Sequence, residues 1–145
     1  METTHYYDIV HDSYSRCAIR KKFFDDFYDT FMSSSPQIAY MFRKSDMEKQ
    51  KKLLDNGVTM MIMFAGGNAI GKIALDHIAK IHRQLNVTEE YYNYWLESLL
   101  QTLKKHDPQY SFKLERAWKE VMGVGIDYLI SNSKMPSSMT VKGRI

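Results

Sequence analysis

The stretch Ile73–Val87, IALDHIAKIHRQLNV, carries two histidines on a segment whose apolar spacing predicts a helix. Five residues separate them, which on a helix leaves them about 140° apart, so His77 and His82 cannot bind one metal ion together. The residues on the face of His82, at offsets of three and four, are all apolar: Leu75, Ile78, Ala79 and Leu85. The face of His77 is mixed, with Ile73, Ala74, Lys80, Ile81 and Gln84. The pattern predicts that His82 points into the protein and that His77 lies nearer solvent.

An imidazole that points into an apolar interior needs partners for both of its ring nitrogens. Ordinary hydrogen bonds can supply them, and so can a metal ion. On the helix pattern alone, a structural helix bundle with a hydrogen-bonded core histidine is the simpler interpretation. The rest of the sequence has to distinguish a hydrogen-bonded core histidine from a histidine that binds a metal.

The chain has 145 residues, the size of one domain, and its one cysteine, Cys17, cannot form an intrachain disulfide. A single cysteine is typical of a reducing compartment, and the polar N-terminal segment does not resemble a signal peptide, so we expect a cytoplasmic protein. The most apolar run, residues 58–71, is short and interrupted by glycine, which argues against a membrane-spanning helix. The 20 basic and 17 acidic residues are scattered, which argues against nucleic-acid binding.

Long unbranched and aromatic side chains are abundant, with 10 methionines, 10 tyrosines and 7 phenylalanines, while glycine (7) and proline (3) are few. This composition favours helices, and no strand-like alternation is present, so we predict one all-α domain over residues 1–132. The predicted helices cover residues 6–19, 21–34, 36–42, 46–65, 69–85, 89–105 and 112–132. Thr88 is the predicted N-cap of the sixth helix. We expect the polar residues 133–145 to form a flexible C-terminal tail.

Residues 27–42, FYDTFMSSSPQIAYMF, place an aromatic pair, a proline and a closing phenylalanine in a specific order. Downstream follow, in order, Gln50, Leu54, His82, Val87 and Trp118. In this combination residues 10–132 resemble a bacterial single-domain globin, similar to the haem domain of flavohaemoglobins. The resemblance implies a globin fold of six to eight helices around a haem pocket, with haem b (iron protoporphyrin IX) as the cofactor.

The resemblance also implies roles for individual residues. His82 matches the proximal histidine that binds the haem iron, and Tyr28 and Gln50 match the distal residues that face a gas ligand. The residues implied to contact the cofactor are Phe42, Leu54, Val58, Ile78, Val87 and Tyr92. A haem is a flat, largely apolar disc, so a pocket of aromatic and aliphatic side chains suits it. A phenol or amide donor beside a bound gas contributes about 1–3 kcal/mol, enough to change affinity tenfold or more.

Some of these assignments leave an alternative open. The segment between Phe42 and Gln50 varies in length among globins, and a shifted register would place Lys49 and Leu53 in the distal positions. Tyr28 can also be an ordinary core tyrosine bonded to a backbone carbonyl. Gln50 can also be a surface residue, since it stands among lysines.

The function implied by the resemblance is reversible binding of oxygen, nitric oxide or carbon monoxide at a pentacoordinate iron held by His82. The alternatives are nitric oxide dioxygenase or peroxidase chemistry with an external reductase, a haem-based gas sensor, and a haem-free helical interaction module. We assign no catalytic residue. Either a monomer or a homodimer is compatible with the sequence.

One departure from the flavohaemoglobin pattern bears on these alternatives. In that family a glutamate on the last helix joins the proximal histidine and a tyrosine, and Tyr92 matches the tyrosine. Ser133 stands where the glutamate would be. A carboxylate there would make the imidazole a stronger electron donor, so its replacement by serine argues against efficient oxygen activation.

Overall fold

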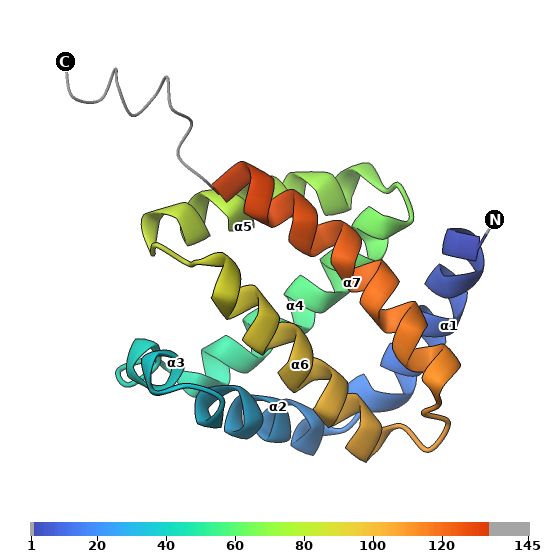
Figure 1. The fold of residues 1–145 in the computed structure, drawn as a ribbon, viewed down its shortest axis with the longest axis horizontal. Helices are drawn as coiled ribbons and strands as arrows, with labels where there is room; N and C mark the ends of the chain where they lie inside the picture. Colours follow the sequence, from blue (N-terminus) through green and yellow to red (C-terminus); the bar gives the residue numbers. More distant parts are fainter. Residues whose placement is uncertain (1, 134–145) are drawn as a thin grey trace.

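The computed structural model describes residues 2–133, which form seven α-helices and no strand (Figure 1). The helices are α1 (Glu2–Ala18), α2 (Lys21–Ser33), α3 (Pro36–Met41), α4 (Met47–Ala65), α5 (Ala69–Gln84), α6 (Glu89–His106) and α7 (Phe112–Ser133). The all-α prediction is confirmed. The first helix begins four residues earlier than predicted, and the other boundaries agree within one residue. Apart from Ser133, the predicted tail 133–145 lies outside the described residues.

Side chains just before three helices fix where those helices begin. Ser35 accepts a hydrogen bond from the backbone N–H of Gln37 at 3.2 Å, and Asp46 accepts one from Lys49 at 3.2 Å. The side chain of Asn68 caps α5 in the same way. Each bond satisfies an N–H group that has no partner within its own helix. Thr88 occupies the predicted N-cap position of α6, but its side chain makes no such bond.

Two glycines set the junction between α4 and α5. Gly67 has a φ of 84°, which side chains with a Cβ rarely adopt, so it allows the chain to turn directly after α4. Gly71 lies on the first turn of α5, and a Cβ there would stand 2.6 Å from the backbone nitrogen of Phe64. The absence of that Cβ lets α5 approach α4 closely. This contact fixes the position of the helix that carries His82.

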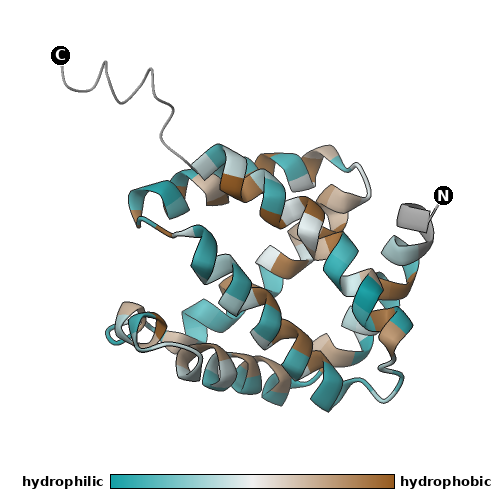
Figure 2. Cartoon of the chain, viewed as in Figure 1, coloured by the Kyte–Doolittle hydropathy of each residue, from teal (hydrophilic) through white to brown (hydrophobic). Residues whose placement is uncertain are grey.

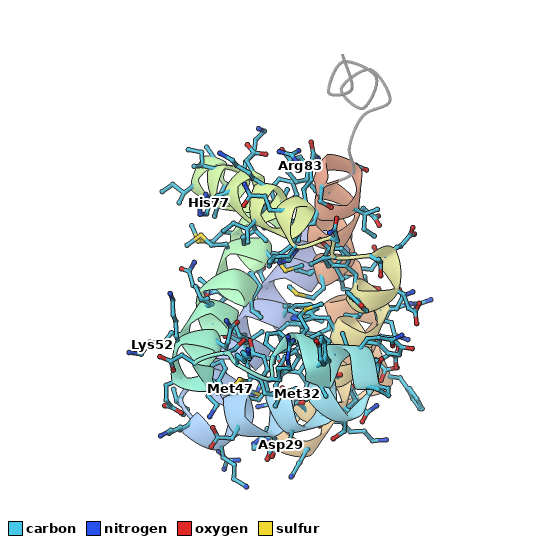
Figure 3. All side chains as sticks on the ribbon, turned by 90° about the vertical axis from the view of Figure 1, so that its left-hand side faces the viewer. Asp29, Met32, Met47, Lys52, His77 and Arg83 are labelled. Atoms are coloured by element: carbon cyan, nitrogen blue, oxygen red, sulfur yellow. The ribbon has the colours of Figure 1, made fainter. Side chains whose placement is uncertain are left out.

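The helices pack as amphipathic units around one core (Figure 2). α7 packs against α1, α4 and α5, and α2 packs against α6. In Figure 1, α5 runs along the upper edge and α2 along the lower edge. Seen from the side in Figure 3, α5 lies above α2 and α3, with α4 and α6 on either flank. None of the described helices combines the length and the apolar character that crossing a membrane requires.

A buried polar network joins α1, α7 and the turn after α6. The indole N–H of Trp118 donates to the hydroxyl of Ser13 at 3.0 Å, and Ser13 donates to Asp107 at 2.5 Å. Arg16 donates twice to the same carboxylate, at 2.9 and 2.8 Å. Burial alone would raise the pKa of Asp107, but the bonds from Arg16, Ser13 and the backbone of Gln109 outweigh it and lower that pKa. The carboxylate therefore stays charged and holds three elements together.

Candidate functional site

His82 lies in the last turn of α5, and its ring is partly buried. Its Nδ1 is 2.8 Å from the phenol oxygen of Tyr92 on α6. Burial disfavours the charged imidazole and lowers the pKa of His82. The ring is therefore neutral near pH 7 and has a lone pair on one nitrogen.

The hydrogen bond between His82 and Tyr92 engages one of the two ring nitrogens. The phenol can donate to Nδ1 or accept from it, according to the tautomer of the ring. Burial raises the pKa of Tyr92, and a hydrogen bond with Ser133 on α7 acts in the opposite direction. Ser133 also donates to the carbonyl of Leu129 at 2.6 Å. Nε2 is therefore the ring nitrogen left for another partner.

The residues predicted for the distal side come together from α2 and α4. The hydroxyl of Tyr28 donates to the backbone carbonyl of Gln50 at 3.0 Å, and burial raises the pKa of Tyr28. Leu54 and Val58, one and two turns further along α4, are buried. The phenol of Tyr28 is therefore protonated and available as a donor. In this structure it donates to a backbone carbonyl, as in the alternative in which Tyr28 is an ordinary core tyrosine.

The exposure of α4 side chains bears on the register of the distal residues. Lys49 and Leu53, which a shifted register would bring into the site, are exposed, and Leu53 shows 52% of its surface to solvent. Gln50 is partly buried, and Leu54 is 6% exposed. These exposures favour the register in which Gln50 and Leu54 face inward.

Several apolar residues predicted to contact the cofactor are only partly buried. Phe42 packs edge-on against Tyr28, with ring centroids 5.7 Å apart, yet it keeps part of its surface open. Ile78 and Val87 on the proximal side are also partly buried and pack against the core. The remaining predicted residue on this side, Tyr92, is 6% exposed. A flat apolar group bordered by these side chains would cover surface that the polypeptide leaves open.

The donor set matches a haem better than a free metal ion. Among the described residues no group of three or more histidine, cysteine, aspartate or glutamate side chains lies close enough to hold a metal. His82 offers one nitrogen. A single imidazole suits a metal that already has four equatorial ligands, as iron has in a porphyrin. The residues present therefore fit a haem.

The comparisons with known proteins agree with this architecture. The family model described as Globin matches residues 25–129. Among solved structures, protein PA3967 from Pseudomonas aeruginosa PAO1 is similar, with 38% sequence identity and a TM-score of 0.84. The match covers 90% of this chain and 99% of that chain, which is described as structurally highly homologous to a human hemoglobin. A search of curated proteins returned no match.

The matched region contains every residue placed in the site above except Ser133, and it includes six of the seven helices in part or in full. The fold, the family model and the similar bacterial structure all lead to one assignment. The chain belongs to the globin family.

Proposed function

We propose that the protein binds haem through Nε2 of His82 and binds oxygen reversibly, along with other diatomic gases. The observation that carries this proposal is the hydrogen bond of 2.8 Å between Nδ1 of His82 and Tyr92. It occupies one ring nitrogen of a neutral imidazole and leaves the other as a ligand. When bound, haem supplies an iron with an open sixth position, which is where a gas molecule binds.

The chain's own residues would hold and shield this group. The hydrogen bond with Tyr92 fixes the rotation of the His82 ring, so the imidazole needs little reorganisation to act as a ligand. Phe42, Ile78 and Val87 supply apolar surface that excludes water from the faces of the disc. Water exclusion matters because a hydrogen bond to a ligand is stronger in a dry pocket.

Tyr28 is the donor best placed to act on a gas ligand. Its hydroxyl is protonated, buried and bonded to one acceptor, the carbonyl of Gln50. That carbonyl belongs to a helix and can keep its intrahelical partner when the phenol turns away. We therefore assign Tyr28 as the main distal donor and Gln50 as an additional amide donor from α4.

Replacing Tyr28 by phenylalanine is expected to weaken oxygen binding by about tenfold or more, because one hydrogen bond to the ligand is lost. The change should appear mainly as faster oxygen dissociation, measured by stopped flow on the reduced, haem-loaded protein. Tyr14→Phe is the matched control, since Tyr14 is similarly buried but donates to Asp55 at the interface of α1 and α4. Equal dissociation rates in Tyr28→Phe and wild type would show that Tyr28 is only a core residue.

The hydrogen-bond chain on the proximal side favours ligand binding over oxygen activation. It runs from His82 through Tyr92 and Ser133 to the carbonyl of Leu129, and every member is neutral. A neutral chain gives the imidazole less electron-donating strength than a carboxylate would. Measuring nitric oxide consumption with an added reductase separates the two functions, because a dioxygenase turns over repeatedly and a gas carrier does not.

A further inference from the structure

The outer face of α5 is apolar and open to solvent. Four of the nine large apolar side chains exposed in the described part of the chain belong to this segment: Ile70 (60% exposed), Ile73 (69%), Ile81 (39%) and Leu85 (60%). On a helix they fall within a sector of about 120°, roughly opposite the buried residues Leu75 and Ala79. His77 lies in the middle of this sector and is exposed at the outer edge of α5 (Figure 3).

No described segment covers this face. α5 packs on α4 and α7 through its other side, and it runs along the edge of the molecule in Figure 1. Exposed apolar patches of this kind on a globular protein commonly mark a contact with another molecule. We call Ile70, Ile73, His77, Ile81 and Leu85 the α5 face.

We propose that the α5 face binds the α5 face of a second copy of this chain, forming an antiparallel, two-fold symmetric dimer. The spacing supports this geometry. Ile73 and Ile81 stand four residues before and after His77, and Ile70 and Leu85 stand seven before and eight after. A two-fold axis at His77 therefore brings Ile73 of each copy against Ile81 of the other. Such self-complementarity is what an isologous interface requires.

The size of the face also suits a dimer. A fully exposed aliphatic side chain has about 130 Å² of surface, so the exposed fractions of the four aliphatic side chains of the α5 face together amount to about 300 Å². A standard protein interface buries about 800 Å² on each partner. A little over half of that surface is apolar, which is about 450 Å². The four side chains provide most of this area. The exposed residue Lys80 stands beside the face, and Asp76 stands one turn before it, so both would form part of a polar rim.

The first test is the oligomeric state of the full chain by sedimentation velocity at micromolar concentration. We expect a dimer, and we expect Ile73→Lys to weaken dimerisation by about a hundredfold, because each copy then buries a charge against Ile81. Phe112→Lys is the matched control, since Phe112 is 92% exposed at the start of α7, away from α5. It should leave the dimer intact. A monomeric wild-type chain, or a dimer unaffected by Ile73→Lys, would overturn the proposal.

The second test locates the two-fold axis. The variant His77→Cys places two thiols together at the axis, so the mild oxidant diamide, which takes up their two hydrogen atoms, should join the two copies by one disulfide in high yield. The native Cys17 is buried and should not compete. Lys72→Cys serves as the control, since position 72 lies off the axis and should cross-link poorly. Equal yields from both variants would contradict the geometry. Both tests use the chain without haem as well as with it, so they do not depend on gas binding.

Discussion

Replacing His82 by glycine is expected to lower haem affinity by more than about a hundredfold and to remove the iron–histidine bond from the spectrum of the reduced protein. His82 offers the one ring nitrogen that the hydrogen bond to Tyr92 leaves free. The substitution also opens a space of imidazole size. Added imidazole should therefore enter that space and restore both haem binding and the absorption spectrum of the wild type.

His77→Gly is the control for this experiment. It places a glycine in the same helix, at an exposed position outside the site, and costs a similar loss of helix propensity. It should keep haem affinity and spectrum unchanged. If His82→Gly retains the wild-type spectrum without added imidazole, another residue holds the iron and the assignment of His82 is wrong.

Replacing Asp107 by asparagine is expected to destabilise the fold by about 3 kcal/mol, which lowers the melting temperature by about 10 °C. The substitution removes the charge that accepts two bonds from Arg16 and one from Ser13, and it leaves the network of Trp118 incomplete. Thermal and denaturant unfolding of both proteins measure the difference. Asp127→Asn, at an exposed position on α7, should change stability little.

The pH dependence gives an independent check on Asp107. The pKa of Asp107 is lower in the folded protein than in the unfolded chain, where an aspartate has a pKa of about 3.9. The stabilisation is therefore complete above that value and is lost as pH falls through the lower pKa of the folded state. The stability difference between wild type and Asp107→Asn should be constant above about pH 5 and shrink below about pH 4. A difference that stays constant down to about pH 3 would contradict the assigned charge.

Most helix boundaries can be predicted because their signals are local. Pro36 and the pair Gly66–Gly67 act through the backbone within a few residues, so the sequence alone locates these ends. The predicted start of the first helix, at Tyr6, is too late, because residues 2–5 are polar and lack the apolar spacing on which that prediction depends. The inward direction of His82 and the exposure of His77 follow from helix periodicity, and the structure agrees.

Contacts between distant residues cannot be predicted in the same way. The carbonyl that accepts from Tyr28 belongs to the backbone of Gln50, and a backbone acceptor leaves no signal in residue identity. The buried pair of Asp26 and His106, with a distance of 2.7 Å, joins residues 80 positions apart. Both residues are polar, and neither gives an indication of burial in the sequence. The roles of the site residues come from the resemblance, since helix spacing alone equally allows a hydrogen-bonded core histidine.

The most direct test of haem ligation by His82 is a titration of the wild-type chain and His82→Gly with hemin, followed by absorption spectroscopy. For the wild type we expect a sharp Soret band that saturates at one equivalent of hemin. Resonance Raman spectroscopy after reduction should show an iron–histidine stretching band. His82→Gly should give neither feature. If the wild-type chain gives no Soret band in excess hemin, it does not bind haem. If His82→Gly gives the same iron–histidine Raman band as the wild type, His82 is not the ligand. Either result would contradict haem ligation by His82.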